Sequence, residues 1–359
     1  MLGDFYVHSK SSYNKIVNKT YNNILIVKYK AMGDSIIGLS SCQYFKDLFP
    51  NSKVTYATTK WTAPLYKNSE GSYDSIYPLD LNTISGFLAF YSYLKSNQFD
   101  LVFELSQATR TKRFFFIYTL LNNLNYKFHN HHLKTNTGII DQGINKAIIQ
   151  RDLDGIYSLV SDNKNYPNFL NYVPTLKLKT QKKENKVILG VVATRETKQW
   201  PLDNFIDLAL LINHKYNSQV IIPLSKSDED QKIKLYLEKK NHSFIKILQS
   251  SLDLLIGNIS DSLVYIGNDT GLKHLSVAIN IPTITLFGPE QPEEWHPYDN
   301  KNHPYLFIEN EKMPCRVENN HYCGLSFCEH HSCMKNITPE DILEVISKKF
   351  NTLFNNDLI

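Results

Sequence analysis

The stretch "YIGNDTGLKHLSVAI" (265–279) predicts a strand, a tight turn and a helix in direct succession. A β-branched and aromatic run ends at Gly267, and apolar residues at helical spacing begin near Leu272. The N-terminus of a helix carries roughly +0.5 charge and free N–H groups, so it suits anions. This turn nevertheless holds a carboxylate, Asp269, and the pair Lys273 and His274 follows one turn later. We therefore expect a ligand that offers both negative charge and hydrogen-bond donors.

The composition is that of a globular protein with two domains. The chain has 359 residues, 42% of them hydrophobic and 21% charged, and this length can bury two cores of ordinary size. It contains no run of about 18 apolar residues, so we expect no membrane-spanning helix. The N-terminal "MLGDFYVHSKSSYNK" has no apolar core of signal-peptide type, which predicts a cytoplasmic location.

The charge is mild and uneven. The net charge is +4, with 18 Lys and Arg against 12 Asp and Glu in residues 1–175 (+6) and 21 against 23 in the remainder (−2). A basic first half suits an anionic substrate or surface. No aromatic and basic recognition motif accompanies this charge, so we expect no binding to nucleic acid.

Strand and helix patterns alternate along both halves of the chain. The predicted strands are 23–29, 53–58, 75–79, 100–105, 126–129, 187–193, 219–224, 243–248, 262–267 and 283–288. The predicted helices between them are 35–49, 84–96, 202–216, 228–240, 253–259 and the helix that follows Gly267. Residues 130–175 are polar and irregular, which predicts a loop-rich linker. This alternation predicts parallel sheets covered by helices on both faces.

Two α/β repeats of similar size predict two doubly wound, Rossmann-like domains that face each other across a cleft. We place the first at 1–178 and the second at 179–335, with a Cys-rich segment at 313–335. Residues 336–359 form a final helix, in which Thr338 is the N-cap and Asp341 the third residue of a capping-box variant.

The loop after the first strand carries a carboxylate. In "VKYKAMGDSII" (27–37), Gly33 permits a tight turn and Asp34 lies where the next helix should begin. One interpretation is that Asp34 or Ser35 caps that helix. The other is that Asp34 is a general base at the carboxyl edge of the sheet.

The equivalent loop of the second domain carries side chains that donate hydrogen bonds. In "VVATRETKQWPLDNF" (191–205), hydroxyl and cationic side chains precede Trp200. They either form a solvated loop anchored by a buried Trp200, or they bind a diphosphate at the sheet edge.

A nucleotide-diphosphate sugar would suit the stretch 265–279. Its phosphates would take the helix N-terminus and the donors of Thr270, Lys273 and His274, while its hydroxyls would donate to Asp269. The alternative is a capped helix whose lysine lies in water.

Three motifs in this order resemble glycosyltransferase family nine, the bacterial ADP-heptose:lipopolysaccharide heptosyltransferases and their relatives. They are "VKYKAMGDSII", "ATRETKQWP" and "GNDTGLKHLSVAINIPTITLFGP", and the match runs from about residue 23 to the C-terminus. The resemblance implies a GT-B fold with the acceptor on the first domain, the donor on the second and the last helix crossing back to the first. It also implies an inverting transfer that requires no cofactor.

The resemblance also implies roles for single residues. Asp34 matches the base that deprotonates the acceptor hydroxyl, and Lys198, with Thr194 beside it, matches the lysine at the departing phosphate. The turn that contacts the donor is matched by Asp269, Thr270, Gly271 and His274. Further donor contacts are expected from Arg195, Ser225, Ser250 and Glu229, the last near the family's ribose-binding glutamate.

Contacts to the acceptor are expected in the first domain, from Lys28, Gly33, Arg110, Lys112 and Arg113. The last three lie in "ELSQATRTKR" (104–113) and offer cations to an anionic acceptor, although a solvated surface explains them equally well.

Two features depart from the family pattern. Residues 29–31 replace small hydroxyl residues, and Ser250 replaces an apolar residue, which leaves recognition of adenine open.

Four cysteines crowd one segment: Cys315, Cys323, Cys328 and Cys333. Their C-x7-C-x4-C-x4-C spacing differs from the paired C-x2-C of a zinc ribbon. A structural Zn or Fe site, as some related protein heptosyltransferases carry, free thiols and disulfides are the alternatives.

The resemblance implies transfer of heptose from ADP-heptose, or another nucleotide-diphosphate sugar, to the Kdo/heptose core of lipopolysaccharide. That acceptor is an anionic lipid-linked saccharide at the inner membrane surface, where the protein would be peripheral. One rival is a protein acceptor, as in autotransporter heptosylation. A rival of another class is an assembly protein that binds nucleotide sugars without catalysis.

Overall fold

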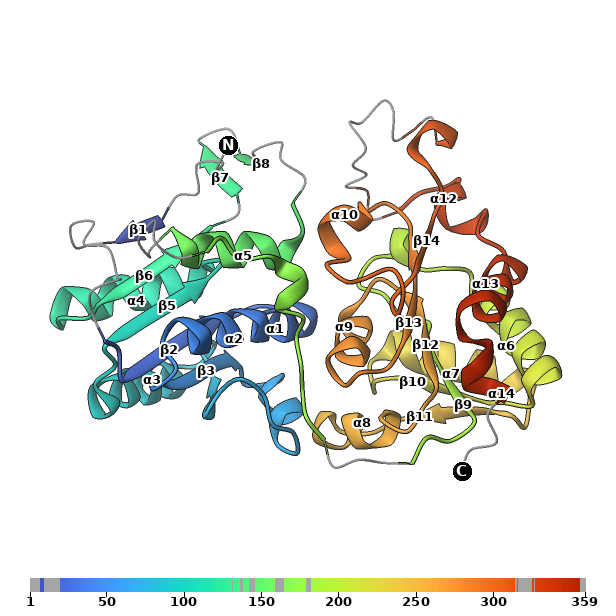
Figure 1. Ribbon diagram of the computed structural model, residues 1–359, viewed down its shortest axis with the longest axis horizontal. Helices are drawn as coiled ribbons and strands as arrows, with labels where there is room; N and C mark the ends of the chain where they lie inside the picture. Colours follow the sequence, from blue (N-terminus) through green and yellow to red (C-terminus); the bar gives the residue numbers. More distant parts are fainter. Residues whose placement is uncertain are drawn as a thin grey trace. The chain divides into compact units, whose positions relative to one another are not determined.

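The computed structural model describes residues 7–9, 20–130, 132–135, 138–141, 146–158, 165–178, 182–313, 315, 325 and 327–355. The chain divides into two compact units, Met1–Lys177 and Leu178–Ile359 (Figure 1). Each unit is built on one largely parallel sheet with helices packed on it, which confirms the predicted α/β class.

The first unit has a six-stranded sheet in the order β1-β6-β5-β2-β3-β4, in which only β1 is antiparallel to its neighbour. Its strands are β1 (Val7–Ser9), β2 (Asn23–Lys28), β3 (Lys53–Thr59), β4 (Ser75–Leu79), β5 (Leu101–Leu105) and β6 (Tyr126–His129). The antiparallel pair β7 (His132–Thr135) and β8 (Gly138–Asp141) is separate. Its helices are α1 (Met32–Ile37), α2 (Leu39–Leu48), α3 (Ile84–Asn97), α4 (Thr109–Leu121) and α5 (Ile148–Tyr157), with 3₁₀ turns η2 (Ala63–Tyr66) and η3 (Phe169–Asn171).

Strand β2 is a continuous apolar run because both of its faces are covered. Leu25 and Val27 face a core that includes Phe90 of α3 and Phe114 of α4. Helices α2 and α5 pack against each other, and the ring of Phe45 from α2 meets Phe103 of β5 edge-on at 5.5 Å. The sheet thus carries helices on both faces, as the first unit of Figure 1 shows.

The second unit has a wholly parallel sheet in the order β11-β10-β9-β12-β13-β14. Its strands are β9 (Lys186–Gly190), β10 (Gln219–Pro223), β11 (Ile245–Leu248), β12 (Val264–Asn268), β13 (Thr283–Phe287) and β14 (Tyr305–Phe307). Its helices are α6 (Leu202–Tyr216), α7 (Asp228–Lys240), α8 (Leu252–Ile259), α9 (Gly271–Ala278), α10 (Pro292–Trp295), α12 (Ser332–Lys335), α13 (Pro339–Val345) and α14 (Asn351–Asn355), with η4 (Glu196–Lys198), η5 (Asn310–Lys312) and the π-helical η6 (Ile346–Phe350).

In both units the strand order reverses beside the first parallel strand, between β2 and β5 in the first and between β9 and β12 in the second. Ligands of doubly wound folds bind outside the carboxyl ends of the strands at this point of reversal. The loops that follow β2, β5, β9 and β12 are therefore where the site should be sought.

Two glycines let β9 and β12 approach closely at this point. A Cβ on Gly267 would lie 2.5 Å from the carbonyl oxygen of Gly190, and a Cβ on Gly190 would meet the ring of Tyr265. Any larger residue would push the two central strands apart.

The C-terminal segment packs on α6 of its own unit. Ile342, Ile346 and Phe350 belong to the core that contains Trp200, and Phe354 stacks on Tyr216 with ring centroids 4.4 Å apart. The predicted capping box is confirmed, because Thr338 and Asp341 bond reciprocally. The predicted crossing of this segment to the first unit stays a prediction.

Two parts of the predicted element pattern were wrong. The predicted helix 35–49 is two helices, α1 and α2, that meet at Gly38. The predicted linker 130–175 contains α5, which is buried along most of its length.

Candidate active site

In the second unit, Asn268 ties the two loops at the point of reversal together. It is fully buried at the end of β12. Its Nδ2 donates to the carbonyl of Val191 at 2.8 Å, and its Oδ1 accepts from the main-chain N–H of Trp200 at 2.9 Å. Trp200 is itself buried, as predicted, and its indole donates to the carbonyl of Ile337. The loop after β9 is thereby held beside the N-terminus of α9.

Asp269 lies between two lysines in this arrangement. Its Oδ2 accepts from Nζ of Lys198 at 2.6 Å, and its Oδ1 accepts from Nζ of Lys273 at 2.5 Å. Lys273 is fully buried and also donates to the carbonyl of Trp295, whereas 16% of the Lys198 side chain is exposed. Lys198 is therefore the lysine of this pair that can reach a ligand.

This geometry corrects the expectation that Lys273 donates to a phosphate. Its ammonium is enclosed, with Asp269 and a main-chain carbonyl as partners and the Phe287 ring 5.0 Å away. Lys273 compensates the charge of Asp269 instead.

The titration of the cluster follows from burial and charge. Burial by itself raises the pKa of Asp269, but the positive charges of Lys273 and Lys198 outweigh it and hold that pKa well below its usual range. Burial, aided by the nearby Lys273, holds the pKa of His274 well below its usual range. Asp269 is therefore ionised and His274 neutral at neutral pH.

His274 lies one turn into α9 and points to an aromatic partner. Its Nδ1 is 2.5 Å from the hydroxyl of Tyr298, and 5% of the residue is exposed. Thr270 occupies the N-cap position of α9 but makes no side-chain cap bond, and both Thr270 and Gly271 are half-buried. The alternative of a capped helix with its lysine in water was wrong, since the Thr270 side chain leaves the first N–H groups of α9 uncapped and Lys273 is fully buried.

Glu290 is a member of the site that sequence reasoning missed. It follows β13, is 9% exposed and forms an ion pair with Arg195 of the β9 loop. Burial raises the pKa of Glu290, and the charges of Lys198 and Arg195 oppose this rise. Arg195 and Glu290 are 95 positions apart in the chain, so only the sheet topology brings them together.

The cluster has three cations, Arg195, Lys198 and Lys273, and two carboxylates, Asp269 and Glu290. With neutral His274 its formal charge is +1, to which the N-terminus of α9 adds. An anionic group is therefore favoured here.

The other predicted donor contacts follow β9, β10 and β11 at the carboxyl edge of the same sheet. Thr194, Ser225 and Glu229 are exposed, and Ser250 is partly buried. The main-chain N–H of Ser225 donates to Asp230 at 2.5 Å, so the neighbouring buried Asp230 holds this loop. The hydroxyl of Ser250 is buried and has no hydrogen-bond partner among the described residues.

In the first unit, Asp34 is the third residue of α1 and is half-buried. The N-cap is Ala31, without a side-chain bond, and Ser35 is buried against Thr58 and Tyr66. The interpretation of Asp34 or Ser35 as N-cap was therefore wrong. Gly33 is also helical, so the turn expected there was wrong too.

Lys28 was expected to contact an acceptor, and the structure corrects this. It is fully buried, and its Nζ lies 3.1 Å from Oδ2 of Asp152 on α5. Because the side chain has no exposed surface, Lys28 belongs to the interior of the unit.

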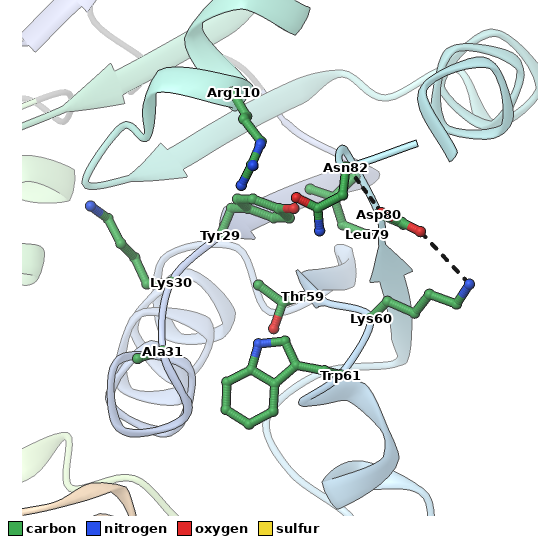
Figure 2. Close-up of a pocket in the computed structure, with 10 residues that line it drawn as sticks. All are labelled: Tyr29, Lys30, Ala31, Thr59, Lys60, Trp61, Leu79, Asp80, Asn82 and Arg110. Carbon is green, nitrogen blue, oxygen red and sulfur yellow. Dashed lines mark hydrogen bonds and ion pairs between the residues drawn. The ribbon is translucent and has the colours of Figure 1, made fainter. Parts of the chain in front are cut away.

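The first unit has a pocket of about 580 Å³ at the carboxyl edge of its sheet (Figure 2). In Figure 2 the Arg110 side chain points toward the Tyr29 ring, and Thr59 and Trp61 lie on the opposite side. The lining residues are Tyr29, Lys30, Ala31, Thr59, Lys60, Trp61, Leu79, Asp80, Asn82 and Arg110. They come from the ends of β2, β3 and β4 and from the first turn of α4.

Three cations and one carboxylate give this pocket a formal charge of +2. The carboxylate, Asp80, lies 3.7 Å from Nζ of Lys60 and accepts from the N–H of Asn82 at 2.9 Å. The structure brings predicted Arg110 into the pocket, whereas Lys112 and Arg113 are exposed on α4 outside its lining. Tyr29, Lys30 and Ala31 of its lining lie in the predicted motif 27–37, and the remaining members were missed because no motif marks them.

The cysteine segment is only partly described. Cys315 is exposed, Cys328 and Cys333 are partly exposed, and Cys323 lies outside the described residues. Within the described part of the chain, no three His, Cys, Asp or Glu residues converge as metal ligands. The predicted metal site stays a prediction.

The model of glycosyltransferase family 9 (heptosyltransferase) matches residues 144–325. The chain belongs to this family. The matched range covers α5 of the first unit and, in the second unit, the β9 loop, α9 and Glu290, so family membership rests mainly on the unit that carries the charged cluster.

Named relatives agree with this assignment. Lipooligosaccharide heptosyltransferase 2 of Campylobacter jejuni is 28% identical over 46% of this chain, and the match spans about half, 52%, of that relative. Lipooligosaccharide heptosyltransferase 2 of Haemophilus influenzae is 23% identical, with 91% of this chain and 99% of that protein covered.

Solved structures show that the fold is GT-B. Escherichia coli ADP-heptose lps heptosyltransferase II has a TM-score of 0.66 at 17% identity, with 92% and 98% of the two chains covered. The iron-containing dodecameric glycosyltransferase TibC from enterotoxigenic E. coli has a TM-score of 0.56 at 12% identity, with 93% and 77% covered. Among the described residues, the helices are too short or too polar to cross a membrane.

Proposed function

We propose that the protein transfers a heptose from ADP-heptose to an anionic, lipid-linked saccharide of the lipopolysaccharide core, with inversion at the anomeric carbon. The observation that carries the proposal is the charged cluster at the N-terminus of α9, whose surplus positive charge suits a diphosphate. The relatives named heptosyltransferases support the class of sugar.

The donor belongs on the second unit. Lys198 and the uncapped N–H groups of α9 neutralise the diphosphate as the bond from the anomeric carbon to its oxygen breaks. Asp269 accepts from Lys198 and thereby holds its ammonium in place. The same carboxylate also accepts a hydrogen bond from a hydroxyl of the donor sugar.

The acceptor belongs in the pocket of the first unit. Its cations suit an anionic saccharide, and Tyr29 and Trp61 offer faces for sugar rings. Asp34 follows the lining residues Lys30 and Ala31 by one helical turn. It accepts the proton of the acceptor hydroxyl while the hydroxyl oxygen attacks the anomeric carbon. All of these steps use side chains of this chain, and none is routed through a metal.

Nucleotide binding tests the donor site. We expect ADP to raise the melting temperature and UDP or GDP to raise it less, because a ligand that binds the folded state stabilises it. Lys198→Ala removes a charged hydrogen bond, so the dissociation constant for ADP should rise about tenfold to a hundredfold.

Lys232→Ala, which changes an exposed lysine of α7, is the matched control and should bind ADP like the parent protein. If ADP gave no stabilisation, or if Lys198→Ala bound it as tightly as Lys232→Ala, the donor site would be assigned wrongly.

A further inference from the structure

Helices α3 and α4 expose an unusual number of large aliphatic side chains. Exposed fractions are 82% for Ile84 and 58% for Leu88 on α3, and 43%, 62% and 71% for Ile117, Leu120 and Leu121 on α4. We call these five residues the aliphatic face. Monomeric soluble proteins rarely gather exposed apolar side chains in this way without a binding partner.

The two helices are neighbours in the first unit, so their exposed residues belong to one side of it. The rings of Phe87 and Phe114 meet edge-on at 4.7 Å, and those of Tyr91 and Tyr118 at 4.9 Å. These inner residues bury the contact between the helices and leave the aliphatic face outside.

The charge on the same two helices has one sign. Neither Ile84–Asn97 nor Thr109–Leu121 contains Asp or Glu. The cations on α4 are Arg110, Lys112 and Arg113, all exposed in its first turns, and α3 carries Lys95 near its end. Along α4, exposed cations are thus followed by exposed aliphatic residues on the outer side of the same helix.

We infer that the aliphatic face and the cations of α4 dock the protein on a bilayer that contains anionic lipid. Basic side chains next to exposed leucines are the features that hold helices in a membrane interface, where apolar groups enter the acyl boundary and cations meet anionic headgroups. A second copy fits less well, because a symmetric contact would bring α4 cations of both copies together without a carboxylate on either helix to compensate them.

One end of the aliphatic face, at Ile84, lies near the pocket of the first unit, whereas Leu120 and Leu121 lie at the far end of α4. Arg110 in the first turn of α4 and Asn82 just before α3 both line that pocket. Docking through α3 and α4 would therefore place the pocket at the bilayer surface, where a lipid-linked acceptor is anchored. This link to the acceptor rests on the proposed function, whereas docking itself rests on exposure and charge alone.

Flotation with vesicles tests the docking. The full chain is mixed with vesicles of phosphatidylethanolamine and phosphatidylglycerol, or with phosphatidylcholine alone, and no donor or acceptor is added. We expect the protein to float with the anionic vesicles and to be released by high salt. Leu120→Gln with Leu121→Gln should lower the bound-to-free ratio at least about tenfold, because two leucines no longer enter the interface.

Matched controls change residues of the second unit that are also more than half exposed. Leu235→Gln with Leu254→Gln alters leucines that are 58% and 55% exposed and should leave binding unchanged. Lys112→Gln with Arg113→Gln should weaken binding to anionic vesicles, whereas Lys232→Gln with Lys239→Gln should not. Circular dichroism and thermal melting establish that each variant folds.

Three outcomes would overturn docking: no flotation of the parent protein, equal flotation after the Leu120 and Leu121 changes, or a dimer that those two changes dissociate. Transfer to a soluble acceptor fragment separates this result from the proposed function. Vesicle binding without transfer contradicts the function, and transfer without vesicle binding contradicts the docking.

Discussion

At the residue scale, the most consequential side chain is Asp269. It is 6% exposed and accepts from Lys198 and Lys273. Asp269→Asn would leave buried Lys273 without its counter-charge, and we expect the free energy of unfolding at pH 7 to fall by about 3–5 kcal/mol. Urea unfolding measures this change, and Asp203→Asn, at an exposed surface pair with Lys240, is the control.

Because of the same carboxylate, we expect the stability of the folded protein to fall in acid. Its folded pKa lies below its unfolded value, so its stabilisation is fully present above pH 4 or so and is lost as the pH falls further. A parent protein whose stability matched that of Asp269→Asn at pH 7 would show that the lysine pair contributes nothing.

For Glu104 we predict the opposite dependence of stability on pH. Burial raises its pKa to about 7, although Thr111 and Tyr126 donate to it. The folded state therefore binds a proton that the unfolded state has released, and stability falls as the pH rises from about 4.5 to 7. Relative to Glu104→Gln, the parent should lose up to about 3 kcal/mol across this interval.

Unfolding of both proteins at several pH values checks this prediction, with exposed Glu238→Gln as control. If the difference in the free energy of unfolding between the parent and Glu104→Gln did not change with pH, Glu104 would have the same pKa in the folded and unfolded states.

At the scale of elements, the contact between β9 and β12 determines where the site forms. Gly267→Ala would place a methyl group 2.5 Å from the carbonyl oxygen of Gly190. We expect this to lower the free energy of unfolding by about 2–4 kcal/mol. The control is Gly257→Ala in α8, where an added Cβ meets nothing within 4 Å. This substitution should stabilise the helix by about 0.5–1 kcal/mol. Equal effects of the two changes would refute the close approach.

The elements also show what the sequence can predict. Strands β4 and β6 and helices α6 and α7 have the predicted bounds, because their apolar spacing and flanking turns are local signals. Helix α5 was missed because buried polar residues, among them Asp152 and Asp154, obscure its apolar period. Asp152 pairs with Lys28, 124 positions away, whereas Asp154 bonds to Lys146, Gln150 and Tyr166, which lie near it in the chain.

For the site, the sequence located the loops but not the pairing within them. Motif order placed Lys198 and Asp269 at the carboxyl edge of one sheet, which the structure confirms. It could not show that Lys273 is enclosed, because this depends on the packing of α9 against Phe287 and Trp295. Nor could it show that Glu290 pairs with Arg195, because this depends on the order β9-β12-β13 in the sheet.

At the scale of the whole molecule, the proposed function assigns the donor to the second unit and the acceptor, with the base Asp34, to the first. The measurement that tests it most directly follows ADP release and the mass of a Kdo-lipid acceptor with ADP-heptose. The parent should release one ADP for each heptose added to the acceptor. Asp34→Asn should lower kcat about 10²–10⁴-fold while the dissociation constant for ADP stays unchanged, and Asp47→Asn, at an exposed carboxylate of α2, should behave like the parent. If the parent released no ADP and added no heptose, or if Asp34→Asn turned over as fast as the parent, the central claim would be contradicted.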